Sequence, residues 1–282
     1  MTKTRSKWQL AVVGILLLLT LQYVLWRSLF TLNLDTLVNG IFSLGLLLAE
    51  ILRLAGSTIQ LFFLSQIKDR SREANWGELS VISGRFTPSV DILIPTYNEH
   101  SSILRRTIIG CQALEYTRKT IYLLDDTRRP EMKKLAAELG CEYITRPNNL
   151  NAKAGNLNNA LPQTSGDLIV VFDADFIPTR NFLKRTVGFF KDKEVALVQT
   201  PQSYYNPDPV AYNLGLENIL TAEEELFYRH IQPIRDSTNS IVCCGTSFVV
   251  RRSAILSIGG FFTDSIAEDY YTGVCLSAQG YK

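Results

Sequence analysis

The sequence predicts an α/β domain with a largely parallel sheet, preceded by two membrane-spanning helices. Two observations support this prediction. The first quarter of the 282-residue chain is rich in leucine and contains two long apolar runs. From Pro88 onward, short apolar segments alternate with segments of helical periodicity, which is the pattern of βαβ units. We therefore divide the chain into a membrane region, residues 1–67, and a second domain, residues 68–282.

The first apolar run, Trp8–Trp26, carries no charge and is about long enough to cross a bilayer as a helix. Aromatic residues lie near both of its ends, where interfacial anchors belong. A cleaved signal peptide is the alternative, but no small-residue cleavage site follows and a second apolar run does. We therefore expect helices over about residues 8–28 and 37–64.

Glu50 and Arg53 interrupt the second run, three residues apart on one helical face, so they could pair. Ionisable groups at membrane depth usually face a bundle interior, so the segment either dips into the interface after Ala49 or meets further helices. Basic residues flank the two runs: Lys3, Arg5, Lys7, Lys68, Arg70 and Arg72. The loop between the runs has only Arg27 and Asp35. The positive-inside rule then places the N-terminus and the second domain in the cytoplasm.

Composition argues against several kinds of site. The net charge of +2 is too balanced to indicate nucleic-acid binding. The two histidines, His100 and His230, lie far apart, so we assign neither a catalytic role. The five cysteines match no zinc spacing and are expected as free thiols in a reducing compartment. They are Cys111, Cys141, Cys243, Cys244 and Cys275.

The segments after Pro88 are expected to alternate between strands and helices. The expected strands are 90–95, 120–124, 141–145 and 167–172, and the expected helices are 101–114, 130–140 and a segment that ends near Leu161. Ser101 is a plausible N-cap for the first helix. A strand-like run with a kink at Gly245 covers Val242–Arg252; the glycine indicates either a close ligand or a tight buried turn.

Polar or acidic residues follow three of the expected strands: Pro95–Glu99, Asp125 with Asp126, and Asp173–Asp175. Ligands of such sheets bind at the carboxyl ends of the strands. One Asp after a strand is usually a turn residue or a cap, but three such ends together indicate a site. If the strand stays extended, the two carboxylates of the third end point the same way. That pair predicts Mg²⁺ or Mn²⁺ and a phosphorylated substrate.

The stretch Arg146–Leu161 holds six asparagines and one lysine, Lys153. The lysine could meet a diphosphate as a point charge, and a helix start near Ala154 and Gly155 could add backbone N–H groups. The amides could bind sugar or phosphate oxygens. A solvated surface lysine is the alternative.

Glu268 and Asp269 stand at the start of an expected helix. They either complement the helix dipole or include a general base, since without a suitable histidine a carboxylate must deprotonate a hydroxyl nucleophile.

These motifs resemble the catalytic subunit of bacterial cellulose synthase and the related processive family 2 glycosyltransferases. The matching stretches follow the family order from about Asp91 to the last residue. They are PTYNE, YLLDDTRRP, NAKAGNLNNAL, FDADFIP, VQTPQSYYNPDP, IQPIRDSTNS, CCGTSFVVRR and AEDYYTGVCLSAQGY. The sequence departs from the usual family motifs where DDT stands for DDG and AED for TED, but the carboxylates are kept.

The resemblance implies a GT-A-type, Rossmann-like fold and an inverting transfer of a sugar, glucose by analogy, from a UDP-sugar to a growing β-glucan at the plasma (inner) membrane. It also implies roles for individual residues. Thr96, Tyr97, Glu99, Asp125, Asp126 and Lys153 would bind the nucleotide sugar; Asp173 and Asp175 would hold Mg²⁺ or Mn²⁺; Asp269, next to Glu268, would be the base; Cys244, Gly245, Thr246 and Ser247 would lie near the acceptor glucan.

The chain stops at Lys282, before the family's Gln-x-x-Arg-Trp motif and later membrane helices, so we expect a truncated chain. Ion-pair partners for Glu50 and Arg53 are then expected in those helices.

The expected binding partners of the protein are the UDP-sugar, the glucan, the membrane and other polysaccharide-synthase subunits, but no nucleic acid. The alternatives are an enzyme making another polysaccharide or a glycolipid, and a non-catalytic paralogue. A phosphatase-like Asp pair is disfavoured, because Phe176 stands where Thr or Val is expected.

Overall fold

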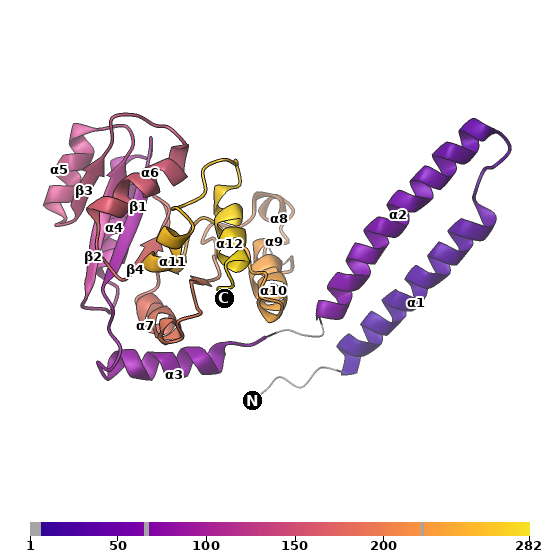
Figure 1. Ribbon diagram of the computed structural model, residues 1–282, viewed down its shortest axis with the longest axis horizontal. Coiled ribbons are helices and arrows are strands. Elements are labelled where there is room, and N and C mark those ends of the chain that lie inside the picture. Colours follow the sequence, from indigo (N-terminus) through magenta and orange to yellow (C-terminus); the bar gives the residue numbers. More distant parts are fainter. Residues whose placement is uncertain (1–6, 65–67, 221–222) are drawn as a thin grey trace. The chain divides into compact units, whose positions relative to one another are not determined.

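The computed structural model describes residues 7–64, 68–220 and 223–282. The chain divides into two compact units, Met1–Asp69 and Arg70–Lys282 (Figure 1). Of the basic residues expected to flank the apolar runs, Lys3 and Arg5 lie outside the described residues.

The first unit contains two long helices, α1 (Lys7–Phe30) and α2 (Leu37–Leu64). Both are long and apolar enough to cross a membrane, by length and composition, over Ala11–Phe30 and Leu37–Ile59. Their positions agree with the two helices expected from the apolar runs.

The two helices are joined by an ion pair, in which Arg27 Nε lies 3.0 Å from Glu50 Oε2. The side chains are only 11% and 25% exposed. The prediction that Glu50 pairs with Arg53 is therefore wrong, and Arg27 belongs to α1 rather than to the connecting loop. An ion pair between two packed helices keeps both charges away from the apolar outer surface of the helices. A pair along the face of one helix leaves both charges on that surface.

In the described part of the second unit, six strands form one sheet in the order β3-β2-β1-β4-β6-β5. They are β1 (Val90–Thr96), β2 (Lys119–Asp125), β3 (Glu142–Thr145), β4 (Leu168–Val171), β5 (Leu197–Gln199) and β6 (Phe248–Arg251). Strands β3, β2, β1 and β4 are parallel, and β6 is antiparallel to both β4 and β5. The prediction of a largely parallel sheet is confirmed. Every residue of β1 is buried, as expected for a parallel strand covered on both faces.

Helices of the second unit connect and cover these strands. They are α3 (Ser71–Ile82), α4 (Ser101–Gln112), α5 (Pro130–Glu138), α6 (Ala152–Ala160), α7 (Phe182–Thr186), α8 (Pro209–Asn213), α9 (Glu223–Leu226), α10 (Gln232–Ser237), α11 (Arg252–Ser257) and α12 (Glu268–Ala278). Short 3₁₀ turns η1 (Leu161–Gln163) and η2 (Val187–Lys191) and a short π-helix η3 (Phe227–Ile231) are also present.

The sheet has an apolar core on each face, so the unit is a three-layer sandwich (Figure 1). On one face, side chains of α4, α5 and α7, such as Leu104 and Leu183, pack against Ile92. On the other, α6, α11 and α12 contribute side chains such as Leu157 and Ile255. Side chains of β1 alternate between the two cores.

Three local details differ from the sequence predictions. The N-cap of α4 is His100 rather than Ser101, because its ring nitrogen Nδ1 accepts the Ser102 N–H at 3.3 Å. Helix α6 begins at Ala152, after Asn151 in the left-handed region (φ 57°), so Lys153 lies in its first turn. Within the predicted strand-like run 242–252, the strand is limited to β6, Phe248–Arg251.

Candidate active site

The parallel register places the carboxyl ends of β1 and β2 side by side, with Thr96 opposite Asp125. Strand β4 runs parallel on the other side of β1. The predicted convergence of three polar strand ends at one edge of the sheet is therefore confirmed.

The carboxylate of Asp125 is fully buried and held by the protein. It accepts the backbone N–H groups of Thr127 (3.1 Å) and Arg129 (2.6 Å) and the hydroxyl of Tyr143 (2.9 Å). Burial alone would raise the pKa of Asp125, but these donors outweigh it and lower the pKa below its ordinary value. Its side chain is therefore occupied in shaping the turn after β2.

Asp126 forms a buried bidentate ion pair with Arg146 (Nε–Oδ1 2.5 Å, Nη2–Oδ2 2.7 Å). The guanidinium also donates to the carbonyls of Leu150 (2.6 Å) and Ala152 (2.8 Å). A Cβ at Gly155 would come within 2.6 Å of Arg146 Nη1, so a glycine is needed for this arginine to fit. Arg146 thus ties the end of β2 to the loop that precedes Lys153.

In the turn after β1, the carboxylate of Glu99 accepts hydrogen bonds from residues of the same turn. Its Oε2 accepts the Thr96 hydroxyl (2.6 Å) and the Tyr97 N–H (2.8 Å). Burial raises the pKa of Glu99, but these hydrogen bonds outweigh it, so the net pKa is lowered. Arg129 donates to the Thr96 hydroxyl at 2.9 Å. Tyr97, in contrast, is 54% exposed.

The asparagine amides of the Arg146–Leu161 stretch largely bind the protein's own backbone. Asn149, Asn156 and Asn158 donate to the carbonyls of Asp126 (2.6 Å), Leu124 (2.9 Å) and Phe261 (2.8 Å), respectively. One N–H of each amide is therefore used within the protein, and the expectation that these amides serve sugar or phosphate oxygens stays a prediction. Asn156 and Asn158 anchor α6 to β2 and to the segment before α12, and Asn149 anchors the preceding loop to the residue after β2.

Four residues from four elements converge on one point. Lys153 Nζ, in α6, is ion-paired with Asp173 Oδ1 after β4 and donates to the carbonyl of Gly245 at 2.7 Å. Gly245 has φ +74°, and a Cβ there would lie 2.9 Å from Asp269 Oδ2 and 3.5 Å from Lys153 Nζ. A narrow pocket is lined by Lys153, Gly245, Glu268 and Asp269. This arrangement places the Lys153 ammonium next to the carboxylate of Asp173 and close to that of Asp269.

The two aspartates after β4 do not lie in an extended strand. The chain turns at Ala174 and Asp175, with the Phe176 N–H bonded to the Asp173 carbonyl at 3.0 Å. The extended arrangement predicted for the pair is therefore wrong, because the strand ends at Val171. Asp173 is 40% exposed at its side chain, and Asp175 is exposed.

No cluster of three or more His, Cys, Asp or Glu side chains suited to a metal is present among the described residues. Mg²⁺ commonly binds through one or two carboxylates and completes its shell with water and substrate phosphates. The hard oxygen donors of Asp173 and Asp175 fit such an ion, provided that a phosphorylated substrate supplies further ligands.

The predicted acceptor segment 244–247 divides into two parts. The hydroxyls of Thr246 and Ser247 are buried: the first accepts the Asp173 N–H (2.9 Å), and the second bonds the Thr200 hydroxyl (2.6 Å). Cys244 donates its N–H to Gln199 Oε1 at 2.9 Å, and burial raises the pKa of its thiol. Only Cys244 and Gly245 therefore remain partly open to a ligand.

Sequence reasoning missed the residues that brace this edge: Arg129, Arg146, Tyr143 and Gln199. Arg129, Arg146 and Gln199 lie within or next to the quoted motifs, which is the only signal that could have found them. Their importance comes from burial against carboxylates and carbonyls, which no local pattern displays.

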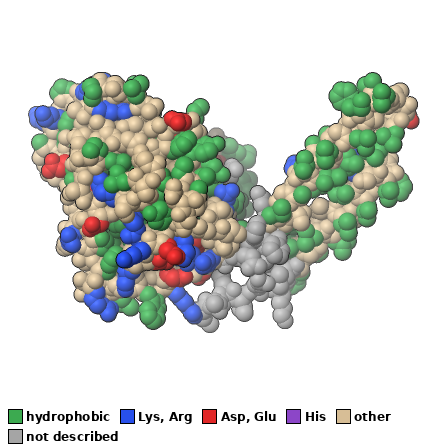
Figure 2. All heavy atoms as spheres, viewed as in Figure 1, with side chains coloured by type: hydrophobic (Ala, Val, Ile, Leu, Met, Phe, Trp, Pro, Cys, Tyr) green, Lys and Arg blue, Asp and Glu red, His purple; other side chains and the backbone are tan. Residues whose placement is uncertain are grey.

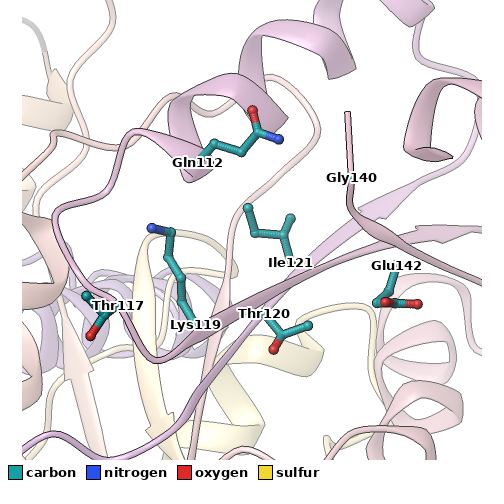
Figure 3. Close-up of a pocket in the computed structure, with 7 residues that line it drawn as sticks. All are labelled: Gln112, Thr117, Lys119, Thr120, Ile121, Gly140 and Glu142. Atoms are coloured by element: carbon teal, nitrogen blue, oxygen red, sulfur yellow. The ribbon is translucent and has the colours of Figure 1, made fainter. Parts of the chain in front are cut away.

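A second hollow lies at the opposite edge of the sheet (Figure 3). It is lined by Gln112, Thr117, Lys119, Thr120, Ile121, Gly140 and Glu142. Lys119, at the start of β2, donates to the carbonyls of Leu114 (2.7 Å) and Tyr116 (3.0 Å), and burial lowers its pKa. None of the predicted site residues lines the hollow. Its lysine binds backbone carbonyls just after the C-terminal end of α4.

The sequence pattern of Glycosyl transferase family 2 matches residues 91–259. The chain belongs to glycosyltransferase family 2. The match covers the six strands and three members of the cluster, Lys153, Asp173 and Gly245, and it ends before Asp269 in α12.

Curated relatives of this family 2 glycosyltransferase confirm the resemblance found in the motifs. The chain is 37% identical over 276 residues to the cellulose synthase catalytic subunit [UDP-forming] of Xanthomonas axonopodis pv. citri (strain 306), covering 97% of the chain. It is 39% identical over 268 residues to cellulose synthase 1 of Komagataeibacter xylinus, covering 94%. It spans only 37% and 17% of the lengths of these relatives.

Among solved structures, the chain is similar to the mannosyltransferase PcManGT from Pyrobaculum calidifontis in complex with GDP-Man and Mn²⁺. The TM-score is 0.55 at 20% identity, over 70% of this chain and 54% of the other. This likeness concerns the fold, and with the family match it confirms the predicted GT-A-type α/β architecture.

Proposed function

We propose that the chain is a membrane-anchored, inverting β-glycosyltransferase that takes glucose from UDP-glucose and is built like a cellulose synthase. The observation that supports this most is the convergence of Lys153, Asp173, Gly245 and Asp269 at the carboxyl edge of the sheet. A cation, a carboxylate suited to a metal and a separate carboxylate lie there around a glycine, which has no side chain to keep them apart.

In this proposal the donor lies along the strand ends. The exposed ring of Tyr97 contacts the nucleotide, while Thr96, Glu99, Asp125 and Asp126 act by holding the surrounding turns. Lys153 receives the diphosphate as a point charge, which requires it to exchange part of its ion pair with Asp173. Mg²⁺ or Mn²⁺ at Asp173 and Asp175 would neutralise charge on the leaving UDP.

Asp269 is the proposed general base. Its Oδ1 accepts the Tyr270 N–H at 2.8 Å, whereas Oδ2 points toward Gly245 and the pocket. The carboxylate takes the proton of an acceptor hydroxyl as that oxygen bonds to the anomeric carbon and the bond to UDP breaks. Attack from the face opposite UDP inverts the anomeric configuration and gives a β-linkage.

The Asp269→Asn variant tests the proposal. We expect calorimetry to show unchanged UDP binding, while sugar transfer, measured as UDP release with acceptor present, falls by roughly 10²–10⁴-fold, the usual contribution of a general base. Asp264→Asn, an exposed acid in the preceding loop, is the matched control and should transfer sugar normally. Full activity of Asp269→Asn would eliminate the base assignment.

Linkage analysis of the product then tests the acceptor. A β-glucan supports the cellulose-synthase-like reading. A different polysaccharide or a lipid-linked sugar keeps the enzyme class but replaces the acceptor, and UDP binding without transfer by the unmodified protein favours a non-catalytic paralogue.

A further inference from the structure

Helix α3 (Ser71–Ile82) has apolar side chains on two opposite faces. One face, which includes Ala74, Gly77 and Val81, is buried and packs against α7 and η2. Packing of this kind fixes the helix to the second unit, so the direction of its other face is set by the fold.

The other face carries three large exposed side chains. Trp76 is 77% exposed, and Leu79 and Ile82 are each 61% exposed. Their spacing of three residues places them on one stripe of the helix. In Figure 2, hydrophobic and basic side chains project side by side at the lower edge of the view, where Figure 1 shows α3. An isolated exposed leucine needs no explanation, but a stripe with a tryptophan does.

The charges around this stripe favour a negatively charged surface. The two acids of α3 are neutralised within the chain: Glu73 pairs with Arg70 at 3.3 Å, and Glu78 pairs with Arg185 at 3.0 Å. Arg72 is exposed and forms no ion pair among the described residues, and the same holds for Arg85 just beyond the helix. The surface therefore presents unpaired positive charge beside the apolar stripe.

We propose that this face of α3 rests on an anionic lipid surface, with Trp76 at the level of the headgroups. Helices of this composition lie in the membrane interface, and tryptophan is the residue most typical of that depth. Only residues 65–70 separate α2 from α3 in the sequence, and a chain of that length reaches at most about 25 Å when fully extended. The inference rests on the proposed membrane anchor formed by α1 and α2.

Tryptophan fluorescence tests the contact directly, because the chain has only three tryptophans. Trp8→Phe and Trp26→Phe together leave Trp76 as the single reporter. The variant is placed in nanodiscs of phosphatidylcholine and phosphatidylglycerol, with or without bromine on the upper part of the acyl chains. We expect brominated lipid to quench Trp76 and iodide in the buffer to quench it several-fold less than an exposed tryptophan.

The matched control moves the reporter to α5, which Figure 1 shows at the far end of the unit from α3. It carries Trp76→Phe and Lys134→Trp in the same background, and it should be quenched by iodide and not by bromine. If Trp76 behaves like this control, the inference is overturned. If Trp76 resists both quenchers, a protein surface covers the stripe and the lipid proposal is equally overturned.

The charge requirement has its own measurement. Arg72→Glu with Arg85→Glu should reduce bromine quenching of Trp76 in discs with phosphatidylglycerol and leave it unchanged in phosphatidylcholine alone. Equal quenching in both lipids would refute the role of anionic headgroups. Failure of the chain to enter nanodiscs would refute the membrane anchor itself, and none of these readouts depends on sugar transfer.

Discussion

The carboxyl edge of the sheet contains two groups of acids that look alike in the sequence and differ in their surroundings. At the end of β2, the side chains of Asp125 and Asp126 are 0% and 6% exposed, and arginines and backbone N–H groups occupy their oxygens. Around Lys153, the side chain of Asp173 is 40% exposed and Asp269 has an oxygen directed at a pocket. The first group preserves the shape of the edge, and the second remains available to a ligand.

The largest effect that this comparison predicts is on stability. Arg146→Met leaves Asp126 buried and unpaired, so it should lower the free energy of unfolding by about 3–5 kcal/mol, the usual loss when one partner of a buried ion pair is removed. Urea unfolding of the detergent-solubilised chain measures it. Arg105→Met breaks an exposed pair with Glu138 and should change stability little. Equal losses in both variants would contradict the division into two groups.

The second prediction concerns binding. Lys153→Ala should weaken UDP-sugar binding by roughly 10–100-fold, which corresponds to the loss of one charged hydrogen bond of about 1.5–3 kcal/mol. Stability should change little, because Lys153 and Asp173 are both partly exposed. Calorimetric titration with UDP-glucose gives the affinity. Lys191→Ala, a lysine that bonds Ser80 on the far side of the domain core, is the control. Unchanged affinity in Lys153→Ala would contradict the diphosphate role and favour the alternative that Lys153 is a solvated surface lysine.

The sequence was sufficient to predict the succession of β1 to β4 along the chain. It was also sufficient to predict that the polar ends of three of these strands meet at one edge of the sheet. Alternating apolar segments and short loops determine both, because a parallel βαβ arrangement brings its strand ends together. The antiparallel β6 could not be foreseen, because its direction depends on a long connection after β5. The Glu50–Arg27 pair was missed for a related reason: it depends on how two helices pack, and the spacing within α2 says nothing about that.

The candidate site was predicted at the level of motifs and not of contacts. Lys153, Asp173 and Asp269 do come together, but the sequence did not show that Arg146 would bury Asp126 or that Thr246 would support Asp173. Such assignments require knowing which oxygens are already occupied, and this is a property of packing.

The third prediction separates backbone strain from crowding. Gly245→Ala places a methyl group 2.9 Å from Asp269 Oδ2 at φ +74°, so it should cost about 1–2 kcal/mol of stability and displace the proposed base. Gly84→Ala has nearly the same φ, +71°, but open space around it, so it should show the strain without any loss of sugar transfer. Thermal unfolding and transfer rates of the two variants measure the two effects. A similar loss of transfer in both would show that Gly245 acts through strain alone.

The smallest predicted effect is a pH dependence from two hydrogen-bonded carboxylates near the ends of β2 and β1, Asp125 and Glu99. The folded-state pKa values of Asp125 and Glu99 are lowered below their ordinary 3.8 and 4.5, so both carboxylates stabilise the fold above these values. This contribution is lost as the pH falls through the lowered pKa values, from about pH 5 downward. It is small because burial offsets part of the hydrogen bonding.

Glu99→Gln keeps an acceptor oxygen for Thr96 and Tyr97 but cannot titrate. In urea titrations at several pH values, it should therefore reduce the loss of stability at acid pH, the acid limb of the stability curve. Thr96→Val removes a donor to Glu99 and should move that limb to higher pH. An unaltered acid limb in Glu99→Gln would show that the stabilising charge lies elsewhere in the domain.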